Sequence, residues 1–298
     1  MAATGEMARV PGGRYRMGST AFYPEEQPIV EVEVDDLWVD VHPVTNAEFR
    51  RFVKDSGWVT VAERAPTPAD FPEADVAQLV PGSQVFTSTA GPVPLDDWRR
   101  WWRWQPGADW RHPEGPGTTL HGLERHPVVH VGWEDAQAYA QWAGKRLSTE
   151  TEWEHAARGG LDNATYAWGN EFLPRGKVMA NTWQGDFPHQ RRRLFNGVGT
   201  SPVGTFPPNG YGLFDVAGNV WQWTLSNWTT GHAERAEEPA THACCAPRSV
   251  VEADRKVMKG GSHLCAPSYC HRYRPAARQG QGVRDTTNHI GFRCVRDM

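Results

Sequence analysis

The chain has 298 residues, of which 39% are hydrophobic and 22% charged, and its formal net charge at pH 7 is −4. This balance is typical of a globular protein and argues against disorder, while a protein that binds nucleic acid phosphates would normally be basic. No stretch approaches about 18 consecutive apolar residues, so no membrane-spanning helix is expected. Residues 1–9 contain neither a basic nor an apolar segment, and we therefore expect no secretory signal.

Glycine, proline and tryptophan are abundant, with 30, 23 and 15 residues respectively. Glycine and proline interrupt long regular elements. Large aromatic side chains can fill a core between irregular loops, because each buries a large area. We therefore expect one compact, loop-rich α+β domain with short helices, although the length would also fit two smaller domains.

The first clear element in chain order is a strand at residues 30–34, where valine and glutamate alternate. A capping box at Thr45-Asn-Ala-Glu48 then starts a helix that Gly57 ends. The segment 65–125 is rich in proline, glycine and tryptophan and is predicted to be a loop.

Two further helices are predicted in the middle of the chain. Residues 134–143 place alanines and a tyrosine at helical spacing before Gly144. A second capping box, Thr149-Glu-Thr-Glu152, starts a helix that ends at Gly159-Gly160. The segment 229–255 is predicted to be a loop.

Three histidines, His121, His126 and His130, lie close enough in sequence to be considered as a metal cluster. Residues 126–131 have the pattern of a strand, on which positions i and i+4 lie about 13 Å apart, too far to share one ion. We therefore interpret these histidines as structural residues with hydrogen-bond partners.

Five cysteines are present, and an odd number without an expected secretory signal does not indicate a disulfide scaffold. Cys265 and Cys270 can work together only if the backbone between them is irregular, which Pro267 favours. Spacing leaves three alternatives open: two unrelated buried thiols, a disulfide, or a metal or redox pair. Zinc is disfavoured because it needs four ligands, and two thiolates alone suit Cu(I) best. For Cys244-Cys245 we prefer two buried small hydrophobic residues over a vicinal disulfide or a metal site.

Oxygen-bearing residues occur on glycine-rich backbone at Asn181-Thr182 and at residues 215–222. Calcium binds carboxylates, amides and carbonyls of this kind. Spacing alone favours ordinary turns at both places.

Motifs throughout the chain fit one known pattern, at residues 10–18, 43–46, 126–131, 142–150, 152–160, 211–221 and 290–294. Together with Lys259-Gly-Gly-Ser-His-Leu-Cys265 and Cys270-His-Arg-Tyr-Arg274, they resemble the formylglycine-generating enzyme (sulfatase-modifying factor) family. The sequence of this cysteine segment is most similar to that of actinobacterial members. The resemblance covers residues 7–296. It implies a single compact α+β domain related to the C-type lectins, with little regular secondary structure.

The resemblance also implies an activity, namely a copper-dependent oxidase that uses O₂ and a thiol reductant. Its substrate would be a sulfatase polypeptide, in which the cysteine of a Cys-x-Pro-x-Arg motif becomes formylglycine. Cu(I) would be held by Cys265 and Cys270, and Ser262, Trp221 and Arg278 match further site positions. Soft thiolates favour Cu(I), and positioning the substrate would be the main task of the protein.

Two structural calcium sites are implied by the same resemblance. The matching residues are Asn181, Thr182, Asp215, Gly218, Val220 and Gln222. The first site has Phe195 where the family has an acid, with Asn196 beside it. In the second site Gln222 replaces a glutamate, so weaker binding is expected.

The family's eukaryotic disulfides cannot form here, because Ala140 stands at the position that would pair with Cys294, and Pro275 removes the other bridge. This fits a reducing compartment, and we expect a cytoplasmic protein without nucleic acid or membrane partners. Two alternatives remain: a non-catalytic binding paralogue, and an iron-dependent sulfoxide synthase of the ergothioneine pathway. The cysteine pair disfavours the first. The lack of an extra N-terminal helical domain disfavours the second.

Overall fold

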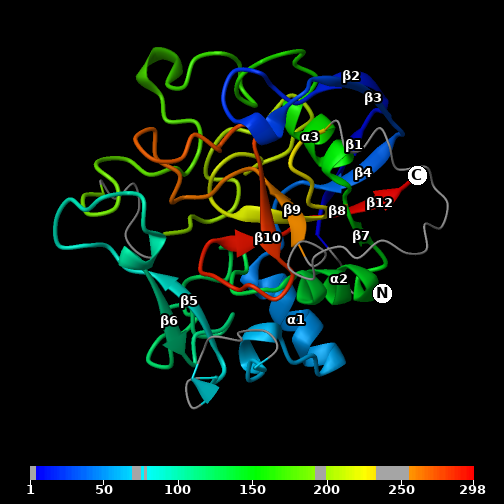
Figure 1. The fold of residues 1–298 in the computed structure, drawn as a ribbon. Helices are drawn as coiled ribbons and strands as arrows, with labels where there is room; N and C mark the ends of the chain where they lie inside the picture. The colour runs from blue at the N-terminus through cyan, green and yellow to red at the C-terminus, as the bar shows by residue number, and fades with distance from the viewer. Residues whose placement is uncertain (1–4, 69–74, 77–78, 192–198, 233–254) are drawn as a thin grey trace, which may run out of the picture.

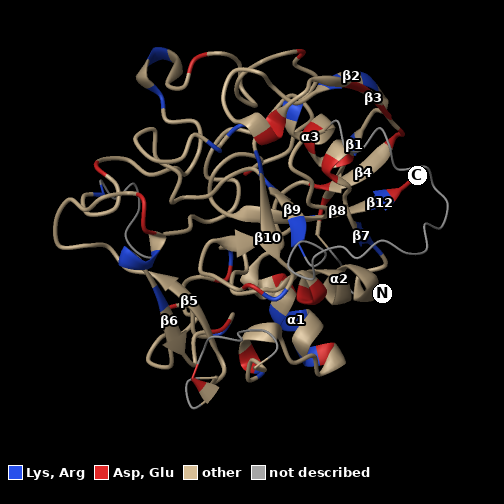
Figure 2. Ribbon diagram, viewed as in Figure 1, with Lys and Arg blue, Asp and Glu red and all other residues tan. Residues whose placement is uncertain are grey.

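The structure is a computed structural model that describes residues 5–68, 75–76, 79–191, 199–232 and 255–298. Short helices and strands are joined by long loops (Figure 1), and residues of both charge signs are interspersed along the chain (Figure 2). In these ranges, no helix has the length and hydrophobicity needed to cross a bilayer. The adjacent pair Cys244-Cys245 and most of the segment 229–255 lie outside the described residues.

The strands form two four-stranded sheets and two hairpins among the described residues. One sheet has the order β1-β4-β12-β7, and its strands are Met7–Val10, Leu37–Asp40, Cys294–Asp297 and Arg146–Leu147. The other has the order β10-β9-β8-β11, with strands Arg278–Gly282, Arg255–Lys259, Trp221–Asn227 and Ile290–Gly291. The hairpins are β2 with β3 (Gly13–Met17, Val30–Val34) and β5 with β6 (Gly82–Phe86, Trp102–Pro106).

Three α-helices form where the sequence predicts them, at Asn46–Ser56 (α1), Trp133–Trp142 (α2) and Glu150–Arg158 (α3). Both predicted capping boxes are present, with the side chains of Thr45 and Thr149 accepting from the backbone of the helix. Gly57 and Gly159 end α1 and α3 in the left-handed conformation that glycine adopts without strain. Short 3₁₀ turns occur at Pro24–Glu26 (η1), Val61–Glu63 (η2), Trp98–Arg100 (η4) and Pro174–Gly176 (η5).

Two predictions about local structure are wrong. The segment 65–125 is not all loop, since it contains β5 and β6 paired in antiparallel register. The segment 126–131 is not a strand, since it holds only an isolated bridge at Pro127, and His130 has a φ of 60°. The strand predicted at residues 30–34 is confirmed as β3.

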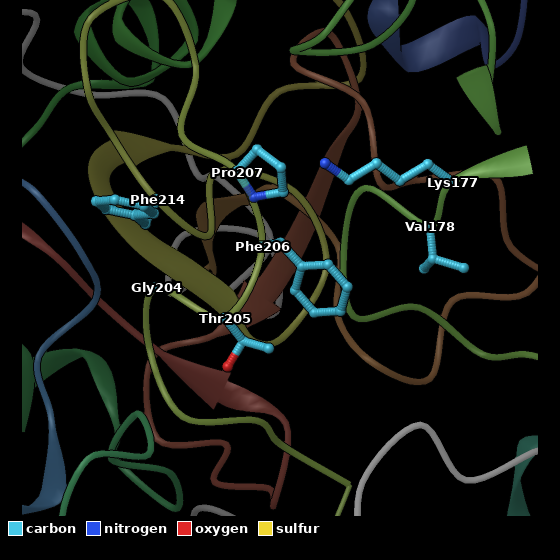
Figure 3. A pocket seen from close by; sticks show the side chains of 7 residues that line it. All are labelled: Lys177, Val178, Gly204, Thr205, Phe206, Pro207 and Phe214. Carbon is cyan, nitrogen blue, oxygen red and sulfur yellow. The ribbon is translucent and has the colours of Figure 1, made fainter. Parts of the chain in front are cut away.

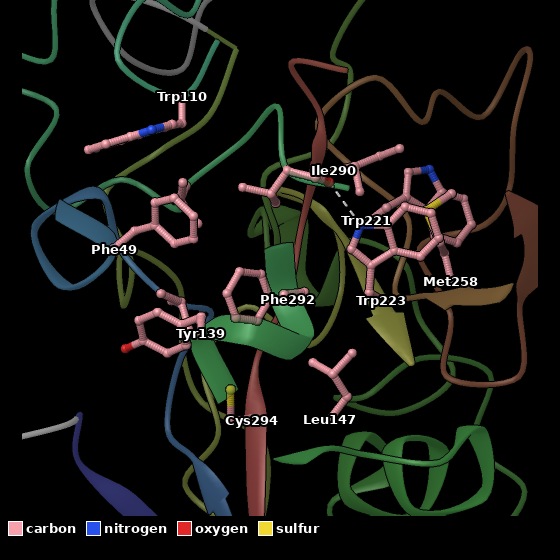
Figure 4. Packing of buried hydrophobic residues seen from close by; sticks show 14 of the residues in the cluster. Phe49, Trp110, Tyr139, Leu147, Trp221, Trp223, Met258, Ile290, Phe292 and Cys294 are labelled. Carbon is pink, nitrogen blue, oxygen red and sulfur yellow. Dashed lines mark hydrogen bonds between the residues drawn. The ribbon is translucent and has the colours of Figure 1, made fainter. Parts of the chain in front are cut away.

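The largest described hydrophobic cluster packs α1 and α2 against the β8–β9 sheet (Figure 4). Phe49, Tyr139 and Phe292 meet at ring centroid distances between 5.3 and 6.3 Å, within the range of favourable aromatic pairs. Trp221 and Cys265 belong to the same cluster. The core therefore extends to the segment in which the sequence places the candidate site.

Candidate active site

The candidate site lies in the loop that connects β9 to β10. These strands are antiparallel neighbours, and Lys259 at the end of β9 pairs with Arg278 at the start of β10. Gly260 and Gly261 turn the chain out of the sheet with φ values of 94° and 68°. A Cβ atom on Gly261 would lie 2.7 Å from the carbonyl oxygen of Arg272. Glycine is therefore required where the loop returns close to its own start.

The base of this loop is fixed by buried charges. Lys259 and Arg278 are like charges opposite each other, which alone would be unfavourable. Helix α3 places Glu150 and Glu154 one turn apart beneath them. The Lys259 ammonium lies 2.9 Å from Glu154 Oε2, and Arg278 Nε lies 2.8 Å from Glu150 Oε1, with all four side chains 0% exposed. The two carboxylates thus provide counterions for Lys259 and Arg278 where the loop begins and ends.

The far part of the loop is held by η1. Arg274 makes a bidentate ion pair with Glu26, with nitrogen to oxygen distances of 2.9 and 2.5 Å, and both side chains are buried. Arg272 lies 2.6 Å from Glu25. These contacts join positions about 250 residues apart in sequence, so the N-terminal part of the chain helps to shape the loop.

The loop brings the two predicted cysteines together. The Sγ atoms of Cys265 and Cys270 are 3.0 Å apart, whereas a disulfide would require about 2.05 Å, and both cysteines are free. Cys265 is buried, while Cys270 is partly exposed. The irregular backbone predicted around Pro267 is confirmed as a series of turns. Of the three alternatives left open by spacing, unrelated thiols and a formed disulfide do not describe this geometry.

The two thiols differ in acidity because they share a hydrogen bond. Burial alone would raise the pKa of Cys265, but the hydrogen bonds from Cys270 and from the backbone of Ser262 bring it below its usual value. The pKa of Cys270 is raised well above its usual value, first by this hydrogen bond and then by burial. The Arg272 guanidinium favours the thiolate form of both. The pair therefore resembles a thiolate that accepts a hydrogen bond from a thiol.

Of the two further predicted site residues, Ser262 contacts the cysteine pair, and Trp221 lies in the hydrophobic cluster that contains Cys265. The backbone N–H of Ser262 donates to Cys265 Sγ over 3.5 Å. The Ser262 hydroxyl is 3.0 Å from Nδ1 of His289. Trp221 is buried in the same cluster as Cys265, and its backbone N–H donates to the carbonyl of His289. His289 was not predicted as a site residue, because it lies 27 positions from Ser262 and belongs to no motif.

Arg278, also predicted as a site residue, contacts Glu150 and the carbonyl oxygens of Glu25 and Thr229. Its guanidinium is fully buried in the ion network at the base of the loop. In the structure Arg278 thus holds the base of the loop in place, and a direct catalytic role for it stays a prediction.

Aromatic side chains form one side of the site. Tyr269 stacks on Phe187 with ring centroids 4.6 Å apart, and Trp101 meets both rings edge-on. Trp102, the first residue of β6, packs against the His289 ring at 4.8 Å. The β5–β6 hairpin, which was not predicted from the sequence, thus supplies part of this aromatic side of the site.

The prediction that the three histidines are structural residues with hydrogen-bond partners is confirmed for His126 and His130. His126 Nδ1 is 2.9 Å from Thr200 Oγ1, and the His130 ring lies between Ser83 Oγ and the Pro113 carbonyl oxygen. His121 is exposed. Within the described ranges, no three histidine, cysteine or acidic side chains are grouped as a metal site.

The residues predicted as calcium ligands come from two segments that lie close together. A Cβ atom on Gly218 would be 2.3 Å from the carbonyl oxygen of Asn181. The Asp215 carboxylate accepts from the backbone of Gly204 and the side chain of Asn219, and burial raises its pKa. Thr182 and Val220 are buried, whereas Phe195 and Asn196 lie outside the described residues.

Gln222 has no free amide group for a cation. Its Oε1 accepts from Trp153 Nε1 and Arg293 Nε, and its Nε2 donates to the carbonyl of Asp215. A positively charged guanidinium on the same oxygen disfavours binding of Ca²⁺ there.

A separate surface hollow of about 540 Å³ is shown in Figure 3. It is lined by Lys177, Val178, Gly204, Thr205, Phe206, Pro207 and Phe214. Its side chains include a single cation and mainly apolar groups, and none is a predicted site residue. The cysteine loop, not this hollow, therefore remains the candidate active site.

Comparison with known structures places the fold. PvdO from Pseudomonas aeruginosa superposes with a TM-score of 0.67 at 21% sequence identity, over 100% of this chain and 96% of that one. This chain thus shares the fold of that protein over nearly the whole length of both chains.

Comparison of sequences then gives the family. Residues 2–298 match the sulfatase-modifying factor enzyme 1-like domain. Formylglycine-generating enzyme from Mycobacterium tuberculosis is 55% identical over 98% of both chains. Mus musculus inactive C-alpha-formylglycine-generating enzyme 2 is 37% identical, over 97% of this chain and 85% of that protein. The chain belongs to the sulfatase-modifying factor enzyme 1-like family.

Proposed function

We propose that this protein is a formylglycine-generating oxidase, which converts the cysteine of a Cys-x-Pro-x-Arg motif in a sulfatase to formylglycine, using Cu(I), O₂ and a thiol reductant. The observation that carries the proposal is the pair of free sulfurs of Cys265 and Cys270, held 3.0 Å apart, with the residue Cys270 partly exposed. Family membership alone is insufficient, because the family includes a relative named inactive.

The residues present fit a Cu(I) ion. Cys265 and Cys270 would hold it, since two thiolates are soft donors that suit this ion. When bound, the ion supplies the redox chemistry that activates O₂, which no protein side chain supplies. The loop is fixed at both ends by buried ion pairs, so the two sulfurs remain close together without a disulfide.

The protein's own residues bind and orient the peptide. Tyr269 is 39% exposed above Phe187 and offers an apolar surface for the substrate chain beside Cys270. The Ser262 hydroxyl and the buried Trp221 shape the inner side of the site. Holding the substrate cysteine in place relative to O₂ is the main contribution that such a site makes to the rate.

The overall reaction balances with the reductant included. One substrate CH₂–SH group, one O₂ and two thiol hydrogens give a thioaldehyde and two waters, and the two reductant thiols form a disulfide. Hydrolysis of the thioaldehyde then consumes one water and releases H₂S and the aldehyde. Oxidation thus breaks the C–H bond at the substrate Cβ atom, the carbon–sulfur bond breaks in the hydrolysis, and the protein's cysteines are not consumed.

The activity is tested by incubating the protein with a Cys-x-Pro-x-Arg peptide, Cu(I) and a thiol in air. The product should have the mass of the aldehyde, and a hydroxylamine probe should label it. A copy of the peptide with serine in place of cysteine is the control. An unchanged peptide mass, with copper bound to the protein, would support the non-catalytic alternative instead.

The copper requirement predicts a definite metal content. We expect one Cu(I) per chain after reconstitution, because only two thiolates are brought together among the described residues. Removal of copper with a strong Cu(I) chelator should abolish turnover, and readdition should restore it. Full activity in a protein shown by elemental analysis to be copper-free would contradict the proposal.

Of the two calcium sites expected from the sequence, we also propose that the one at Asp215 binds a structural Ca²⁺ ion, with the carbonyls of Gly218 and Val220 and without the Gln222 amide. The site at Asn181 and Thr182 stays a prediction, because Phe195 and Asn196 lie outside the described residues. Asp215 supplies the one carboxylate, so the site is weak. A free Ca²⁺ concentration 100 times the dissociation constant adds about 2.7 kcal/mol to the free energy of unfolding. A chelator should therefore lower the thermal midpoint by several degrees in wild type and leave an Asp215→Asn variant unchanged. Equal midpoints with and without chelator in wild type would contradict this site.

A reducing, cytoplasmic setting is proposed from the cysteines. All three described cysteines are free thiols, and Cys294 is buried in the apolar core that also contains Ala140, with no disulfide partner there. Structural disulfides are rare in such a compartment.

A further inference from the structure

We propose that His289 is a positioning residue for the oxidation, acting through the hydroxyl of Ser262; this rests on the proposed function. The carrying observation is the 3.0 Å contact between His289 Nδ1 and Ser262 Oγ. Ser262 is in turn linked to the cysteine pair, because its backbone N–H donates to Cys265 Sγ. The side chain of His289 thus reaches the site through one hydroxyl group.

The contact restricts the hydroxyl strongly. Ser262 Oγ also accepts the backbone N–H of Leu264 over 3.2 Å. A serine hydroxyl has one donor and two acceptor positions. With Leu264 and His289 engaged, a single bonding direction remains, in either tautomer of the imidazole. Ser262 can therefore offer one fixed hydrogen bond to the reacting groups, where an unrestrained hydroxyl would rotate.

His289 itself is held rigidly for this task. Its carbonyl accepts from the backbone of Trp221, its backbone N–H donates to Thr287 Oγ1, and its ring packs against Trp102. The pKa of the imidazole is lowered to about 3, mainly by burial and to a smaller extent by the nearby His130. The ring therefore stays neutral at working pH and acts as a fixed hydrogen-bond partner, with no role as a cation.

The test compares His289→Asn, His289→Gln and His289→Leu on the peptide substrate. The Asn amide is attached to Cγ, as Nδ1 is in histidine, so Asn can reproduce the contact, whereas the longer Gln places its amide one bond further out. We expect His289→Leu and His289→Gln to lower kcat by about tenfold or more with KM nearly unchanged, and His289→Asn to retain most of the activity. The proposal would be overturned if His289→Gln were as active as His289→Asn, or if His289→Leu had the kcat of wild type.

Action through Ser262 is tested by a double-mutant cycle. In a Ser262→Ala background, His289→Leu should change kcat by less than about twofold, because the hydroxyl that it orients is gone. Independent, multiplicative losses would overturn the proposed route. Cu(I) affinity, measured by chelator competition, should be the same in His289→Leu and wild type, and a loss of affinity would show that His289 acts on the metal site instead.

A matched control exists elsewhere in the chain. His126 makes the same kind of contact with a hydroxyl, 2.9 Å from Thr200 Oγ1, and His126→Asn should leave kcat within about twofold of wild type. If wild type itself does not oxidise the peptide, the proposed function fails. If wild type is active and His289→Leu equals it, only the role of His289 fails.

Discussion

Cys265→Ser and Cys270→Ser should each abolish aldehyde formation while the protein stays folded. A serine hydroxyl is a hard and weakly acidic donor, so a site with one thiolate loses most of its preference for Cu(I). We expect turnover to fall by about 10³-fold or more, which corresponds to about 4 kcal/mol of transition-state stabilisation. Mass measurement of the peptide gives the rate, and Cu(I) competition gives the affinity.

The matched control for these variants is Cys294→Ala. Cys294 is also a buried free thiol, but it lies in β12, which belongs to a different sheet from the strands β9 and β10 that flank the cysteine loop. Its replacement should affect stability and leave turnover nearly unchanged. Circular dichroism melting separates loss of fold from loss of function. Normal turnover in either Cys265→Ser or Cys270→Ser would remove the proposed role of the sulfur pair.

Glu154→Gln should destabilise the protein by about 3–5 kcal/mol, the usual cost of breaking a buried ion pair. Glu154 lies between Lys259 and Arg158, at 2.9 and 2.7 Å, and is fully buried. The neutral amide would remove the carboxylate that Lys259 and Arg158 share, and would leave Lys259 only the more distant Glu150, at 3.6 Å. Urea unfolding followed by circular dichroism measures the loss of stability.

The exposed pair Arg14–Glu33 provides the control. Its side chains are 71% and 68% exposed, so Glu33→Gln should change stability by less than about 1 kcal/mol. A loss of similar size in both variants would show that the buried network has no special role.

The stability difference between wild type and Glu154→Gln should also depend on pH. Burial alone would raise the pKa of Glu154, but Lys259 and Arg158 bring it below the ordinary value of 4.5. A carboxylate with a lowered folded-state pKa stabilises the fold above its unfolded value, and this stabilisation is lost as pH falls through the folded value. The difference should therefore be full near pH 7 and shrink below about pH 4.

Local signals predicted the helices well, and long-range contacts limited the rest. The capping boxes at Thr45 and Thr149 lie within four residues and needed no tertiary information. The β5–β6 hairpin was missed because its strands are embedded in a segment rich in proline, glycine and tryptophan. His130 broke the predicted strand by adopting a positive φ that its contacts with Ser83 and Pro113 hold in place.

The candidate site shows the same limit. Spacing could not decide whether Cys265 and Cys270 meet, because an irregular loop sets their distance. That loop is shaped by Glu26 and Glu154, which are remote in sequence. His289 and Glu25 carry no local signal at all, since only the folded chain brings them to the loop.

We propose that the paired sulfurs of Cys265 and Cys270 hold the Cu(I) ion on which the oxidation depends. X-ray absorption at the copper edge of the reconstituted protein tests it directly. We expect two sulfur ligands in the resting protein and an additional sulfur when the Cys-x-Pro-x-Arg peptide is added. A copper spectrum dominated by nitrogen or oxygen ligands, or one that is unchanged in Cys265→Ser, would contradict it.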